Sequence, residues 1–156
     1  MINKIFTSIL FLFLSSCGYE VMHSKKNSIN YNFSISELTF VGDRNVNIKI
    51  KEKLAYYNYG LIKKDKDFVL NISSNTEKIV VAKNTAGDPT SFKSTIIINI
   101  EVLMKNNLKS NLQIIESFNY NNNTDKFNLK IYEREIINNL AETASEKIIY
   151  KLSNIR

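Results

Sequence analysis

Side chains that commonly carry out catalysis are scarce in this chain of 156 residues. The one histidine, His23, lies in a polar stretch near the N-terminus, where we expect it to be solvated. Two carboxylate pairs, Asp65/Asp67 and Glu133/Glu135, are close enough in sequence to suggest an acid–base or metal site, but we expect them to be solvated charges. No glycine-rich phosphate loop is present. The sequence therefore predicts neither an enzyme nor a metal or cofactor site.

The single cysteine, Cys17, has the clearest chemical role. It follows a positive residue, Lys4, a short apolar run (5–14) and two serines, which is the order typical of a secretory signal peptide. The stretch from Leu14 to Gly18 resembles the lipobox of bacterial lipoproteins. This resemblance implies that residues 1–16 are removed as a lipoprotein signal peptide. It also implies that the thiol of Cys17 carries a diacylglycerol and its new amine a further acyl chain; the alternative is a buried or free cysteine.

Such an anchor would decide where the protein resides. Each buried methylene contributes about 0.8 kcal/mol, so two or three acyl chains hold a protein on a membrane effectively permanently. No later stretch has the roughly 20 apolar residues that a spanning helix needs. In enterobacteria an aspartate after the lipidated cysteine commonly retains a lipoprotein in the inner membrane, and here that residue is Gly18. We therefore expect a lipid-anchored protein on the periplasmic side of the outer membrane.

Length and composition predict one domain after the anchor. About 140 residues remain after cleavage, enough to bury roughly 68–70% of the surface of the unfolded chain. We expect residues 17–28 to form the lipidated N-terminus and a tether, and residues 29–156 to form a single domain. Because the only cysteine is used for lipid, no disulfide can form within the chain. The net charge of +6 favours anionic partners weakly, and nucleic acid is not expected in this compartment.

A first strand and a first helix are predicted between residues 29 and 60. Apolar and polar residues alternate, and the phase of the alternation changes at Glu37, which indicates a β-bulge. The strand ends before Asp43, and either Asp43 or Asn45 can cap the helix that follows. Gly60 lies where a C-terminal cap is expected. The predicted apolar stripe of this helix consists of Val46, Ile50, Leu54 and Tyr57.

Three further strands are predicted before the last helix. The first starts at Phe68, pauses near Asn75 and resumes before a turn at residues 84–90. The next, residues 92–104, shows the clearest alternation in the chain, and the last covers residues 112–120. Because these strands are close in sequence and are joined by turn-rich segments, we expect an antiparallel meander.

The longest helix is expected to begin after Thr124 or Asp125. A second apolar patch, formed by Leu129, Ile136 and Leu140, lies opposite its main apolar face, on the side expected to meet water. The residues expected to pack on the sheet are Phe127, Ile131, Ile137, Ala141, Ala144, Ile148 and Leu152.

The predicted order of elements is β-α-β-β-β-α, which excludes a doubly wound sheet. We therefore expect an α+β fold in which a four-stranded mixed sheet has both helices packed on one face. The other face of the sheet is expected to be polar or covered by a partner.

This architecture, after a lipobox and Tyr19, resembles the LPS-assembly lipoprotein family, LptE (RlpB). The segment from Ser117 through Arg134 to Leu140, with the closing residues 148–152, is similar to the C-terminal pattern of that family. The resemblance implies a one-to-one complex in which the lipoprotein plugs an LptD-type outer-membrane β-barrel. It further implies that the protein helps to assemble this barrel and to deliver lipopolysaccharide to the cell surface.

Two candidate contact surfaces follow from this resemblance. We expect the second apolar patch of the last helix to contact the barrel; the alternatives are that part of this segment is extended or that the patch packs on the tether. We expect the hairpin tip to contact lipopolysaccharide through Lys83, Lys93, Lys78 and Pro89, because cations beside apolar residues suit phosphates beside acyl chains. An ordinary surface hairpin with solvated lysines is the alternative. The alternative function is a free-standing periplasmic lipoprotein that binds an envelope ligand or inhibits a hydrolase.

Overall fold

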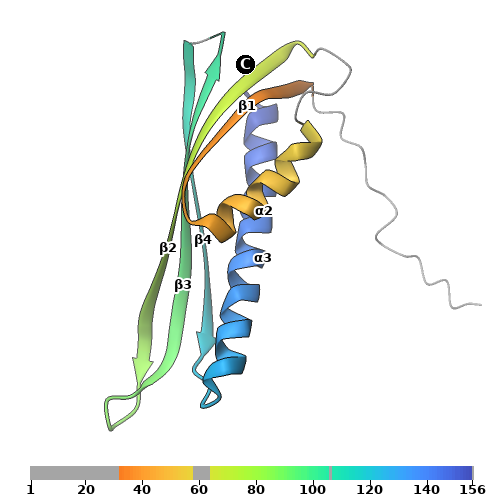
Figure 1. Ribbon diagram of the computed structural model, residues 1–156. Coiled ribbons are helices and arrows are strands. Elements are labelled where there is room, and N and C mark those ends of the chain that lie inside the picture. Colours follow the sequence, from red (N-terminus) through yellow and green to blue (C-terminus); the bar gives the residue numbers. More distant parts are fainter. Residues whose placement is uncertain (1–31, 58–63, 106, 156) are drawn as a thin grey trace, which may run out of the picture. The chain divides into compact units, whose positions relative to one another are not determined.

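The computed structural model describes residues 32–57, 64–105 and 107–155. The predicted signal peptide, Cys17, the tether, the first residues of the predicted domain and the proposed cap at Gly60 lie outside these residues. The described chain forms one sheet with two helices on one of its faces (Figure 1), as predicted. Its elements are β1 (Phe33–Gly42), α2 (Arg44–Leu54), the 3₁₀ turn η1 (Ala55–Tyr57), β2 (Lys66–Lys83), β3 (Pro89–Met104), β4 (Asn107–Asn121) and α3 (Lys126–Ser153).

The four strands lie in the order β1-β2-β3-β4. β1 is parallel to β2, and the other neighbours are antiparallel, so the mixed sheet and the meander are both confirmed. The predicted pause near Asn75 is wrong, because β2 runs unbroken for 18 residues and Asn75 pairs with Ile97. Its polar residues fit a strand because their side chains find hydrogen-bond partners at the start of α2. Ser74 donates a hydrogen bond to Asn47 Oδ1 (2.7 Å) and Thr76 to Asp43 Oδ2 (2.9 Å), so the start of α2 satisfies them.

The link from β1 to α2 has the predicted form. The register of β1 against β2 shifts between Ile35 and Glu37, which confirms the bulge. Gly42 ends the strand with a φ of +100°, a backbone conformation that residues other than glycine rarely adopt. Asp43 then caps α2 by accepting hydrogen bonds from the backbone of Asn45 (2.9 Å) and Val46 (3.1 Å).

The core lies between the inner face of the sheet and the two helices. Alternate residues of the strands point into it, and the polar Ser145 of α3 is accommodated by donating to the Ala141 carbonyl. The fully buried large side chains are Phe33, Phe68, Ile35, Ile50, Leu54, Leu70, Ile72, Ile96, Ile98, Ile100, Ile148 and Leu152.

The predicted orientation of the first half of α3 is wrong. Leu129, Ile136 and Leu140 are only 7%, 5% and 9% exposed and belong to the core, whereas Phe127 and Ile131 are 73% and 37% exposed. The buried positions follow one another mostly in steps of four, longer than the 3.6 residues of a helical turn. The buried stripe therefore winds around this 28-residue helix as it crosses a twisted sheet. The sequence prediction fails here because a helical wheel treats the buried stripe as one straight face along the helix axis.

Candidate functional site

The candidate site lies at the end of the sheet where β4 ends and α3 begins, beside the hairpin that joins β2 to β3 (Figure 1). An open, mostly polar groove of about 480 Å³ is found here. It is lined by Asn121, Asn122, Asn123, Thr124, Leu129 and Tyr132.

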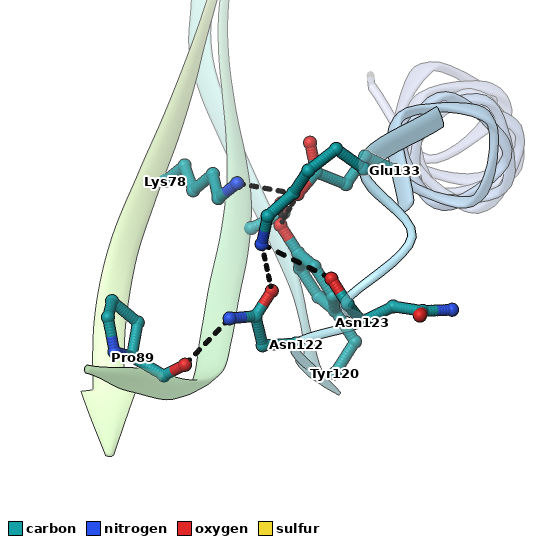
Figure 2. Close-up of polar contacts among 8 residues, drawn as sticks. Lys78, Pro89, Tyr120, Asn122, Asn123 and Glu133 are labelled. Carbon is teal, nitrogen blue, oxygen red and sulfur yellow. Dashed lines mark hydrogen bonds and ion pairs between the residues drawn. The ribbon is translucent and has the colours of Figure 1, made fainter. Parts of the chain in front are cut away.

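Asn122 holds three elements together beside this groove. Its backbone N–H donates to the Thr90 carbonyl (2.8 Å) and its side-chain amide to the Pro89 carbonyl (2.7 Å). Its side-chain oxygen accepts from Lys126 Nζ (3.1 Å), which also donates to the Asn123 carbonyl (3.2 Å). Figure 2 shows how these contacts tie the start of β3 to the turn before α3. The asparagine-rich turn is therefore ordered by specific hydrogen bonds.

A second group of contacts joins β2, β4 and α3. Lys78 Nζ forms an ion pair with Glu133 Oε1 (2.5 Å), and the same oxygen accepts a hydrogen bond from the hydroxyl of Tyr120 (2.9 Å; Figure 2). The Lys78 ammonium also lies 4.1 Å from the ring centroid of Phe92, a cation–π distance. Ser94 donates to the Tyr120 hydroxyl at 3.4 Å. We call Lys78, Tyr120 and Glu133 the three-residue link.

Burial and charge change the proton affinities within the three-residue link. Burial raises the pKa of Tyr120 above its usual value, and the hydrogen bond to Glu133 raises it further. Burial acts to lower the pKa of Lys78, but the hydrogen bond to Glu133 and the nearby negative charge outweigh it, so this pKa is raised overall. Both groups therefore hold their protons near neutral pH, and the three-residue link joins the hairpin to the helix through an ammonium and a phenol that both contact Glu133.

The structure does not bring all the predicted lipopolysaccharide contacts together. Lys78 pairs across the sheet with the buried Ser94 and so lies on the inner face, whereas Lys93 is one residue out of phase and lies on the outer face. Lys83 is exposed and pairs with Pro89 at the end of the hairpin. Lys78, which was expected further down the incoming strand than Lys83, therefore lies on the opposite face from Lys93 and is bound to Glu133.

The hairpin tip itself is a compact turn. Asn84 accepts hydrogen bonds from the backbone of Ala86 (3.0 Å) and Asp88 (2.8 Å), and its amide donates to the Asp88 carboxylate (3.3 Å). Gly87 has a φ of +90°, which favours glycine. This confirms the turn predicted at residues 84–90.

Sequence reasoning missed the roles of Tyr120, Glu133 and Asn122. Glu133 was predicted to be solvated with Glu135, but only Glu135 is exposed. Glu133 follows Leu129 by four residues and shares its side of the helix, but the helical wheel placed that side toward water, so the inward direction of Glu133 was missed as well. Within the described ranges, no group of three or more His, Cys, Asp or Glu could hold a metal ion, and no helix is long and apolar enough to cross a membrane.

No protein-family model matches this chain, and no curated protein matches it by sequence. Solved structures do match. The rare lipoprotein B from Shewanella oneidensis aligns with a TM-score of 0.58 and 14% identity, over 76% of this chain and 94% of its own. A minor lipoprotein from Acinetobacter baumannii aligns with a TM-score of 0.58 and 11% identity, over 79% and 91%.

The third match is an uncharacterized lipoprotein B from Nitrosomonas europaea, with a TM-score of 0.58 and 12% identity over 79% of this chain and 86% of its own. At such low identities the matches establish a shared fold. The resemblance to the LptE (RlpB) family is thereby confirmed at the level of architecture: the described chain has the fold of the rare lipoprotein B structures.

Proposed function

We propose that this protein is a lipid-anchored lipoprotein of the outer membrane, facing the periplasm, and a subunit of a lipopolysaccharide translocon. The observation that carries the proposal is the combination of two independent features. Its fold covers 94% of the chain of a rare lipoprotein B structure, and a lipobox-like stretch ends at Cys17 before that fold begins. In this role the protein plugs an LptD-type barrel in a one-to-one complex, helps to assemble it and delivers lipopolysaccharide to the cell surface.

The outer face of the sheet is the best candidate for contact with the barrel. Leu129, Ile136 and Leu140 are buried within the domain and cannot be the main contact. Both helices lie on the inner face, so the outer face is free of them (Figure 1). It combines hydrogen-bonded polar pairs with exposed apolar residues, and the lumen of an outer-membrane barrel is polar. The polar pairs are Asn71–Glu101 (3.2 Å) and Gln113–Asn99 (2.9 Å); the apolar residues include Ile79 and Ile115.

Affinity purification from solubilised membranes of cells that produce the protein tests this proposal. A large β-barrel protein is expected to co-purify in equal amount, and mass spectrometry is expected to find acylated Cys17. The matched variant Cys17→Ser should lose both the acylation and the lipoprotein-type cleavage. Recovery of the acylated protein alone would favour the free-standing lipoprotein that binds an envelope ligand or inhibits a hydrolase.

Lipopolysaccharide contact is proposed for the hairpin end, where Lys83 and Lys93 remain candidates on the end and outer face of the hairpin. Replacing both with alanine should weaken lipopolysaccharide binding and reduce its salt dependence, while the barrel complex persists. The matched control replaces Lys51 and Lys109, which are exposed on other elements. Equal binding by both double variants would remove the hairpin from consideration.

A further inference from the structure

The outward side of the first half of α3 carries two adjacent rows of exposed side chains. One row consists of Lys126, Lys130 and Arg134, each four residues from the next, and all three are exposed. The row beside it begins with Phe127 and Ile131, which are 73% and 37% exposed. Residues four apart lie next to one another on a helix surface. We call these five residues the α3 patch; it sets three cations against two apolar side chains.

The positive charge of the α3 patch is largely uncompensated. Within the part of the chain that the structure describes, the ion pairs do not include Lys130 or Arg134. Lys126 donates only to neutral oxygens, those of Asn122 and Asn123. The patch is therefore able to attract an anionic partner.

The acidic residues of this half of α3 do not cancel that charge. Asp125 caps the helix, and Glu133 is held by Lys78 and Tyr120. Glu135 is exposed four residues after Ile131, at the far end of the apolar row. The first turn of α3 contains no acidic residue, although acidic residues there would stabilise the helix. Lysine at the first helical position is thus unfavourable for the helix itself.

We propose that the α3 patch docks on an anionic phospholipid surface. A row of cations parallel to the helix axis can meet headgroup phosphates along its whole length, while Phe127 enters the interface beside it. A basic, amphipathic helix face of this kind is typical of membrane-surface binding. An exposed aromatic ring also fits a lipid interface better than it fits water.

The inference rests on the proposed function only for the lipid anchor, which keeps the domain close to a bilayer and raises the effective concentration of lipid. It concerns the lipoprotein before it enters the barrel, because a domain inside the lumen cannot touch the bilayer. The chain between the anchor and the domain is long enough to let the α3 patch reach the membrane. The 28 residues of α3 extend over about 42 Å. The chain between residues 17 and 32 can span up to roughly 50 Å when extended. Even the end of α3 that is far from the start of β1 is therefore within reach of the membrane.

The chain contains no tryptophan, so a single introduced tryptophan reports on its own surroundings. Phe127→Trp places the reporter in the α3 patch, and Tyr150→Trp places a matched reporter at a residue near the other end of the helix that is 66% exposed. The full lipidated protein is reconstituted in vesicles of phosphatidylglycerol and phosphatidylethanolamine, with brominated lipids as quenchers. We expect a blue shift and quenching at position 127 and neither at position 150. Vesicles of phosphatidylcholine should give neither change.

A charge variant tests the two cations of the α3 patch that take part in no described ion pair, Lys130 and Arg134. In the Phe127→Trp background, Lys130→Gln with Arg134→Gln should reduce the ratio of docked to free patch at least tenfold. Lys126 is kept, because its hydrogen bonds to Asn122 and Asn123 order the turn before α3. Lys51→Gln with Lys109→Gln changes the net charge equally and should leave the quenching unchanged.

Several results would overturn the proposal. These are equal quenching at positions 127 and 150, equal signals with phosphatidylcholine, or a signal only in vesicles that contain lipopolysaccharide. Unlipidated Cys17→Ser protein added to the same vesicles should still dock at higher lipid concentration. An unmodified Cys17 in the membrane protein would therefore contradict the proposed function, whereas absent quenching at position 127 would contradict the docking alone.

Discussion

Replacing Leu140 with alanine tests the burial of the first half of α3. Leu140 is 9% exposed, so the change removes three carbons that are almost entirely out of water. At about 0.8 kcal/mol for each methylene-sized group, the lost transfer free energy is roughly 2.4 kcal/mol. The cavity left behind adds to this, so we expect the free energy of unfolding to fall by about 3 kcal/mol.

The matched control is Phe127→Ala, which removes a larger side chain from the opposite side of the same helix. Phe127 is 73% exposed, so its loss should change the free energy of unfolding by no more than about 0.5 kcal/mol. Alanine also has the higher helix propensity, which further limits the cost.

Urea unfolding followed by circular dichroism measures both variants. With an m-value of roughly 2 kcal/mol/M, the Leu140→Ala midpoint should fall by about 1.5 M, and the Phe127→Ala midpoint should barely move. The reverse order of the two effects would show that α3 turns its Phe127 side to the sheet. The assignment of the α3 patch would then fail together with the burial of Leu140.

Three further predictions concern Gly42, between β1 and α2, and the three-residue link of Lys78, Tyr120 and Glu133. Gly42→Ala should cost several kcal/mol of unfolding free energy, because the added Cβ would lie 1.9 Å from the Ser74 carbonyl oxygen and φ is +100°; a urea midpoint near wild type would contradict this. A double-mutant cycle of Lys78→Met and Glu133→Gln should give a coupling of about 1 kcal/mol, since the side chains are 41% and 25% exposed and solvent screens the pair; zero coupling would mean that the ion pair contributes nothing. The raised pKa values of Tyr120 and Lys78 mean that the folded state binds these protons more tightly than the unfolded chain does. Their stability contribution is complete below pH 10.0, the ordinary Tyr pKa, and is lost as the pH rises through the folded values; urea midpoints at alkaline pH should therefore fall less in Tyr120→Phe than in wild type.

Local patterns were sufficient to predict most of the fold. The alternation that changes at Glu37 indicates a bulge because a strand can change which face is buried only by gaining or losing a residue. Asp43 after a glycine predicts both the end of β1 and the cap of α2, since each depends on its own backbone neighbours. The polar stretch around Asn75 was misleading, because its hydrogen-bond partners come from α2, a distant part of the sequence.

The orientation of α3 could not be found from a helical wheel alone. A wheel assigns one direction to the core for the whole helix, whereas the sheet beneath α3 twists. Ala141 and Leu152 were correctly placed in the core because the second half of the helix dominates the average. In the first half the two sides were exchanged: Phe127 was expected to pack on the sheet and Leu129 to face water, whereas Leu129 is buried and Phe127 is exposed.

The three-residue link was only partly predictable. The parity of β2 places Lys78 on the same face as the buried Leu70 and Ile72, so its inward direction could have been deduced. Its partner could not, because Glu133 lies 55 residues away and is brought near by the packing of α3. Contacts between distant elements depend on how those elements cross, and sequence periodicity carries no information on that.

The two ends of the described chain meet at one pole of the domain. Asn32 donates to the Asp65 carboxylate (2.5 Å), and Lys66 Nζ, in the neighbouring residue, donates to the carbonyl of Ile155 (2.5 Å). A short linker could therefore join these ends, and new ends could be opened in the Asn84–Asp88 turn. Such a circular permutant would keep every strand pairing while moving the point of attachment of an anchor to the opposite pole. It would convert the orientation of the domain relative to its membrane into an experimental variable.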